Sequence, residues 1–71
     1  MIKRFLVIKR TFLGKGNGSG FRRVGLMKDD EIEHNGECFS TIFRKKELLK
    51  NPKISKSAIE KALKRGVIKE I

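Results

Sequence analysis

The strongest structural signal in this 71-residue chain is the segment DDEIEHNGECFSTI, residues 29–42. At its centre, Asn35-Gly36 supplies the two positive-φ positions of a type I′ turn, so the segment predicts a β-hairpin with a two-residue loop. Such a loop pairs Ile32 with Phe39 on a buried face. The acidic residues of this segment then belong mostly to one strand rather than to a disordered tract.

The chain before this hairpin predicts another pair of antiparallel strands. Residues 2–13 carry apolar side chains on both faces, which indicates a strand covered on both sides at its centre. Residues 14–20, GKGNGSG, contain four glycines and predict a loop. Residues 21–27 resume a strand pattern, so the two strands pair across a basic glycine-rich loop.

The chain after the Asn-Gly hairpin predicts helices. Residues 43–50 predict a short helix that stops before Pro52. Residues 55–65 predict a longer amphipathic helix, which Gly66 ends as a C′ residue. Residues 67–71 then predict a closing strand or a tail packed on the sheet.

Two signals compete for the start of the longer helix. Ser57 with Glu60 fits a capping box, whereas Ile54 and Ile59 fit a hydrophobic staple around Ser55. Either start leaves the same apolar stripe toward the core.

Length and apolar content fit a single α+β domain over residues 1–71. The expected architecture is a small antiparallel β-sheet or SH3-like partial barrel with one C-terminal helix. Phe5, Phe12, Phe39 and Phe43 are expected in the core. Phe21, beside the glycine loop, is the candidate for an exposed aromatic platform.

The order of these elements, with the KDDEIE strand and the ending SAIEKALKRGVIKEI, resembles small bacteriophage-encoded proteins with an SH3-like β-barrel or α+β fold and one appended helix. The resemblance covers residues 28–33 and 57–71. In that pattern a glycine precedes the aspartate, and Asp29 stands in its place here. The resemblance implies a phage or mobile-element setting and no particular activity. A cytoplasmic protein is expected, in the host cytoplasm if it is phage-encoded.

Charge is arranged in three blocks. Residues 1–28 carry eight Lys or Arg and no acid, residues 29–37 carry five acids and no Lys or Arg, and residues 38–71 carry ten basic residues and three acids. The net charge of +10 indicates a protein that binds through electrostatics. The expected partner is therefore nucleic acid (DNA or RNA) or, alternatively, an acidic protein surface.

The first predicted hairpin gathers the candidate phosphate-binding residues toward one end, and they are Lys9, Arg10, Lys15, Phe21, Arg22 and Arg23. The outer face of the longer helix, with the residue before it, forms a secondary basic face of Lys53, Lys56, Lys61, Lys64 and Arg65. Either set also fits an ordinary solvated surface.

Other functional classes have no support in the sequence. The glycine loop lacks the spacing of a dinucleotide fingerprint or a P-loop. His34 and Cys38 are two lone ligands where zinc needs three or four, so the sequence predicts a turn histidine paired with Glu37 and a buried thiol instead of a metal site. With neither a catalytic set nor a cofactor motif, we expect a non-enzymatic protein without a small-molecule substrate or a cofactor.

The opening residues, MIKRFLVIKR, have too short an apolar run for a signal peptide, and no stretch approaches the length of a membrane span. A single cysteine precludes an intramolecular disulfide and agrees with a reducing cytoplasm.

Overall fold

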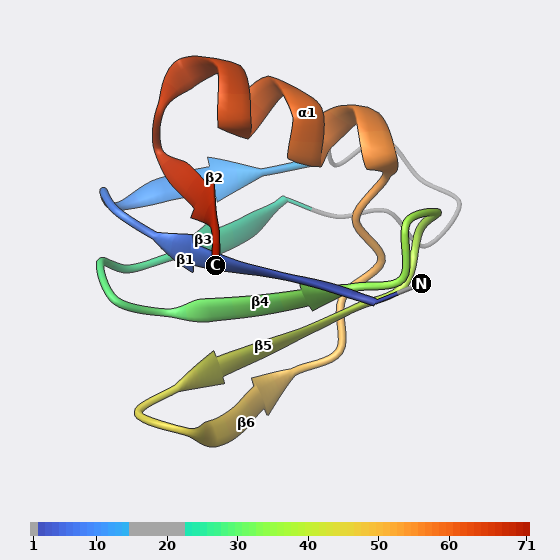
Figure 1. Ribbon diagram of the computed structural model, residues 1–71. Helices are drawn as coiled ribbons and strands as arrows, with labels where there is room; N and C mark the ends of the chain where they lie inside the picture. The colour runs from blue at the N-terminus through green and yellow to red at the C-terminus, as the bar shows by residue number, and fades with distance from the viewer. Residues whose placement is uncertain (1, 15–22) are drawn as a thin grey trace.

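The computed structural model describes residues 2–14 and 23–71. Its elements in chain order are β1 (Lys3–Val7), β2 (Thr11–Leu13), β3 (Val24–Leu26), β4 (Glu31–His34), β5 (Ser40–Arg44), β6 (Glu47–Lys50), α1 (Lys56–Arg65) and β7 (Ile68–Glu70). The strands form a five-stranded sheet, β6-β5-β4-β1-β7, and a two-stranded sheet, β2-β3, with antiparallel pairing throughout (Figure 1). The predicted α+β class and the closing strand are confirmed. The described strands do not close into a barrel.

A bent two-stranded ribbon connects the two sheets. Leu6 pairs with Glu31 in the larger sheet, and Thr11 pairs with Leu26 in the smaller one. The two residue numbers add to the same value in both pairs, as they do along one antiparallel ladder. The predicted pairing is confirmed for residues 11–13 with 24–26, whereas the first part of the predicted strand, β1, pairs with β4 and β7 instead. The predicted glycine loop lies outside the described residues except for its first residue, Gly14.

The core lies against one face of β1 and β2 only. Phe5, Val7 and Leu13 are buried, whereas Phe12 is 55% exposed. The expectation of a first strand covered on both sides is therefore wrong, because α1 lies over one face (Figure 1). The buried cluster consists of Phe5, Val7, Leu13, Val24, Leu26, Ile32, Ile42, Ile54, Ile59, Ala62, Val67 and Ile68.

The hairpin between β4 and β5 has a different register from the predicted one. Ile32 pairs with Ile42 instead of Phe39, and the loop consists of residues 35–39. Because this register differs by an odd number of residues, Phe39 leaves the buried face and is 56% exposed. Of the four phenylalanines expected in the core, Phe5 is buried and Phe43 is half-buried, and the other two are exposed.

Asn35 organises this longer loop through its side chain. Its Oδ1 accepts hydrogen bonds from the amides of Glu37, Cys38 and Phe39 at 2.9, 3.2 and 3.1 Å. The Asn35 side chain is therefore the acceptor for three backbone amides of the loop, a role that it would not have in a two-residue turn.

The predicted short helix at residues 43–50 is wrong, because these residues form most of the β5–β6 hairpin. Arg44 pairs with Glu47, which leaves Lys45 and Lys46 as a two-residue turn. Their φ angles of 54° and 67° lie in the left-handed region, as a type I′ turn requires. Lysine has no preference for that region, so the sequence carries no local signal for the turn.

Helix α1 begins after Ser55, as the hydrophobic staple predicts, and not after Ser57, as the capping box predicts. Ser55 is the N-cap, and its Oγ accepts a hydrogen bond from the amide of Ala58 at 3.2 Å. Ile54 and Ile59, on either side of the cap, are both buried. Gly66 ends the helix with a φ of 74°, as predicted.

Candidate functional site

Most cations of the described surface have no acidic partner. Within residues 2–14 and 23–71, Arg44 pairs with Asp30 at 2.9 Å and Arg4 pairs with Glu33 at 3.6 Å. The other lysines and arginines of these ranges make no ion pair. A negatively charged partner would therefore meet cations that the fold itself has not neutralised.

The Asp30–Arg44 pair joins the residue directly before β4 to the end of β5. Asp30 is buried, and Arg44 donates from Nε to Oδ1 at 2.9 Å and from Nη2 to Oδ2 at 3.0 Å. The amide of Met27 also donates to Oδ2, at 2.9 Å. Burial by itself raises the pKa of Asp30, but the hydrogen bonds from Arg44 and Met27 outweigh it and hold the pKa below its usual value. Three donors therefore hold this carboxylate and favour its ionised form.

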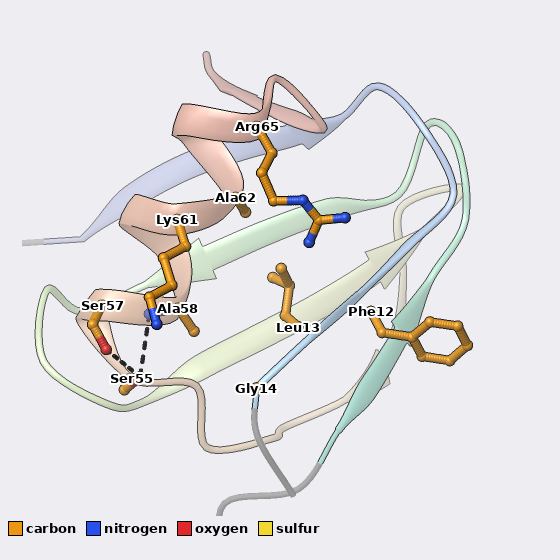
Figure 2. Close-up of a pocket in the computed structure, with 9 residues that line it drawn as sticks. All are labelled: Phe12, Leu13, Gly14, Ser55, Ser57, Ala58, Lys61, Ala62 and Arg65. Atoms are coloured by element: carbon orange, nitrogen blue, oxygen red, sulfur yellow. Dashed lines mark hydrogen bonds between the residues drawn. The ribbon is translucent and has the colours of Figure 1, made fainter.

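A hollow of about 130 Å³, the α1–β2 groove, lies between α1 and β2. Figure 2 shows the helix residues on one side of it and the β2 residues on the other. Apolar contacts come from Leu13, Ala58 and Ala62. The other described residues that line the groove are Phe12, Gly14, Ser55, Ser57, Lys61 and Arg65.

Two cations stand on the helical side of the groove. Lys61 and Arg65 are one turn apart and share a face of α1, as residues four apart do. In Figure 2 the Arg65 side chain reaches away from the helix axis, out over the groove, and Lys61 points toward the serines at the start of the helix. Neither cation pairs with a described carboxylate, so both charges are available to an anion.

The bend between β1 and β2 adds two further cations at the C-terminal end of α1. The amides of Ile8 and Lys9 donate to the carbonyl oxygen of Val67 at 2.8 and 3.3 Å. Val67 lies two residues after Arg65, so the backbone fastens the bend beside the end of the helix. The side chains of Lys9 and Arg10 are both exposed. We call Lys9, Arg10, Lys61 and Arg65 the groove cations.

Phe12 lines the groove from β2, and its ring points away from α1 (Figure 2). The residue is 55% exposed although Thr11 and Leu13 on either side are buried. It pairs with Gly25 of β3, where an added Cβ would lie 3.2 Å from the ring carbon Cε1. The ring therefore rests against bare glycine backbone, which supports it while it stays exposed to solvent.

The structure distributes the remaining predicted site residues around the molecule. Arg23 directly precedes β3 and lies beside the end of β2 that is farther from the bend. The three residues of β2 span about 10 Å, which separates Arg23 from the bend. The Nζ atom of Lys53 lies 5.9 Å from the centre of the Phe39 ring. Lys56 and Lys64 are exposed on α1 and do not line the groove. The other predicted members, Lys15, Phe21 and Arg22, lie outside the described residues.

The sequence therefore identified all four groove cations but assigned them to two separate surfaces. It missed Phe12, which it placed in the core. The missing signal is the cross-strand pair of Phe12 with Gly25, and this pair becomes visible only once the register of β2 and β3 is known.

His34 is a structural residue of the interior and does not pair with Glu37. Its Nε2 lies 2.6 Å from the carbonyl oxygen of Ile54, and its Nδ1 accepts a hydrogen bond from the amide of Gly36 at 3.0 Å. Cys38 is half-buried rather than fully buried. In the part of the chain that the structure describes, no group of three or more His, Cys, Asp or Glu residues is placed to hold a metal ion.

No family model matches the chain, and comparisons with curated proteins and with solved structures found no match. Among the described residues, no helix has the length and apolar character needed to cross a membrane. The chemistry of the α1–β2 groove is therefore the basis for a functional proposal.

Proposed function

We propose that this protein is a non-enzymatic nucleic-acid-binding protein that holds phosphates with the groove cations. The observation that carries the proposal is that Lys61 and Arg65 line one groove without described acidic partners, while the bend with Lys9 and Arg10 is fastened beside the C-terminal end of the same helix. Phosphate contacts of this kind give affinity and position a nucleic acid without reading its sequence.

A binding role fits the groove better than catalysis does. Its described lining contains two serines and two cations, and no His, Cys, Asp or Glu that would activate a nucleophile. The carboxylate of Asp30 is engaged elsewhere. The groove thus offers charge and apolar surface, which suits recognition of a polyanion.

The salt dependence of binding tests this proposal. We expect the double variant K61Q/R65Q to bind single-stranded DNA more weakly than the wild type at low salt. Because each lost contact to a single strand lowers the slope of log affinity against log salt by about 0.7, the slope should fall by about 1.4. Fluorescence anisotropy over a salt series measures both quantities.

The control is K45Q/K46Q, which removes the same charge from the β5–β6 turn, far from α1 (Figure 1). We expect this control to retain the wild-type slope. Equal loss in the two variants would mean that only net charge matters, and it would overturn a site at the groove.

We further propose that the two sheets form an open SH3-like partial barrel. The support is the continuous ribbon through β1–β2 and β3–β4, whose bend carries the strands from one sheet to the other over a common core. Strands that bend from one sheet into the other in this way make the corners of small β-barrels.

A second candidate function is docking on an acidic protein, as a phage-type accessory or structural protein would do. The observation that favours it is β6, a sheet edge on which all four residues are exposed. Leu48 is 60% exposed and Leu49 45% exposed, and Lys45, Lys46 and Lys50 flank them. An acidic strand from another protein would complement both the open edge and the cations.

A peptide of alternating Glu and Val tests this second candidate. We expect it to shift the NMR amide signals of β6 in the wild type and not in L48K/L49K, a variant with more positive charge but no leucines in β6. Shifts that persist in the variant, or that fall outside β6, would contradict docking at this edge.

A further inference from the structure

We infer that the α1–β2 groove selects single-stranded over duplex nucleic acid, with Phe12 as the surface on which a base stacks. This inference rests on the proposed function, and it adds the class of nucleic acid and a residue that recognises it.

The state of the Phe12 ring is the first argument. A phenylalanine that is 55% exposed between two buried neighbours covers little of the core. Its contact with Gly25 fixes the inner side of the ring and leaves the outer side open. A ring already held in place loses little freedom when a base stacks on it, so stacking there carries a low entropic cost.

The position of the ring relative to the charges is the second argument. Phe12 lines the same groove as Lys61 and Arg65, and it lies two residues after Arg10 at the bend. Because the ring points away from α1, the path that we infer for the strand runs from Lys61 and Arg65 over β2 to the side on which the ring is exposed. Basic grooves with an aromatic platform are the common architecture of single-strand binding.

Duplex nucleic acid cannot use this platform. Its bases are already stacked on their neighbours, so an exposed phenylalanine gains nothing unless a base leaves the helix. A duplex would meet only the groove cations. The selectivity should therefore come from Phe12, and the underlying affinity from the cations.

The test compares three labelled ligands of equal length, about 12 nucleotides, by anisotropy at about 50 mM salt. They are an oligothymidine, the same backbone with abasic sites throughout, and a duplex. We expect the wild type to bind the oligothymidine at least about fivefold more tightly than the abasic strand, because a stacked base contributes at least that factor.

The matched variants are Phe12→Leu and Phe39→Leu. Leucine at position 12 still covers Gly25 but offers no aromatic face, so we expect it to bind the oligothymidine and the abasic strand equally. Phe39 is as exposed as Phe12 but lies outside the groove. We expect its leucine variant to retain the wild-type preference.

The variant Phe12→Trp reports directly, through its fluorescence, whether a base contacts the side chain at position 12. The chain contains no Trp or Tyr, so this tryptophan is the only such fluorophore. We expect the oligothymidine to change its emission strongly and the abasic strand to change it little. This variant keeps the test valid even if Phe12→Leu folds poorly.

Failure of the inference and failure of the proposed function look different. If the wild type binds the oligothymidine and the abasic strand equally, phosphate binding stands and stacking on Phe12 is overturned. The same holds if Phe39→Leu loses the preference and Phe12→Leu keeps it. If none of the three ligands binds tighter than millimolar, the proposed function itself is overturned.

Discussion

Asp30 shows how one residue of the acidic block serves the fold rather than a partner. Its side chain joins the Met27 amide, before β4, to Arg44 at the end of β5. A buried carboxylate is stable only when such donors compensate its lost hydration. The acids therefore do not form one uniform surface.

Replacing Asp30 by Asn should destabilise the protein in a pH-dependent way. The folded-state pKa of Asp30 is lower than its unfolded value, so the ionised carboxylate stabilises the fold above about pH 4. This stabilisation is lost as the pH falls through the folded-state pKa. We expect Asp30→Asn to lower Tm at neutral pH, with a difference from wild type that shrinks in acid. Thermal melts followed by circular dichroism at several pH values measure this.

Glu33→Gln is the control for that experiment, because its pair with Arg4 is longer and Arg4 is exposed. Exposed pairs contribute little, so we expect only a small change in Tm. A gap between wild type and Asp30→Asn that stays constant down to about pH 3 would contradict the role assigned to the carboxylate.

The two exposed phenylalanines show what single-residue reasoning misses. Composition correctly suggests that phenylalanines build the core, and Phe5 does so. Whether Phe12 or Phe39 points inward depends on register and on which face α1 covers, and both are set by distant parts of the chain. For the same reason the cations of the candidate site were predictable from the sequence, whereas its aromatic platform was not.

Among the elements, the β5–β6 hairpin contains the least favourable backbone for its sequence. Lys45 and Lys46 both occupy the left-handed region, which asparagine and glycine adopt more easily. We therefore expect K45N/K46G to raise the free energy of unfolding by about 1 kcal/mol. Urea denaturation measures the change.

The variant K45Q/K46Q separates the turn effect from the charge effect. It removes the same two charges but keeps side chains that disfavour positive φ. The turn explanation requires K45N/K46G to be the more stable of the two, and equal stability would leave charge alone as the cause.

At the start of α1, substitutions of two serines should have different effects on stability. Ser55 accepts the hydrogen bond from Ala58, whereas Ser57 lies within the first turn. We expect Ser55→Ala to cost about 1 kcal/mol and Ser57→Ala to cost much less. Chemical denaturation of both variants checks this, and the reverse order would place the helix start at Ser57.

Elements with several agreeing local signals were predictable, and isolated turns were not. The 55–65 helix has a cap, a staple, an apolar stripe and a terminal glycine, and the structure has this helix. Asn35-Gly36 is a strong but single signal, and the hydrogen bonds of the Asn35 side chain produce a longer loop instead. Asp29 has a φ of 74° at the position where the small phage-encoded proteins that the chain resembles have a glycine. A non-glycine residue can therefore occupy such a turn when the surrounding strands impose it.

For the molecule as a whole, the net charge of +10 is confined to a body of 28 × 25 × 24 Å. With only two ion pairs among the described residues, most of this charge remains unbalanced. The same cations that favour an anionic partner therefore repel one another in the free protein. Binding and folding are coupled through this repulsion.

Added salt should consequently stabilise the free protein. At low ionic strength the screening length exceeds the size of the molecule, whereas at about 0.1 M it is about 10 Å and distant cations no longer repel one another. We expect Tm to rise between low and moderate sodium chloride in calorimetric scans. Inorganic polyphosphate at equal ionic strength should raise Tm further, because an anion that binds the folded state adds its binding free energy. K61Q/R65Q should lose most of this additional rise and keep the response to sodium chloride, whereas K45Q/K46Q should keep both. A Tm that falls steadily over the same salt range would mean that favourable ion pairs outweigh the repulsion, contrary to this account.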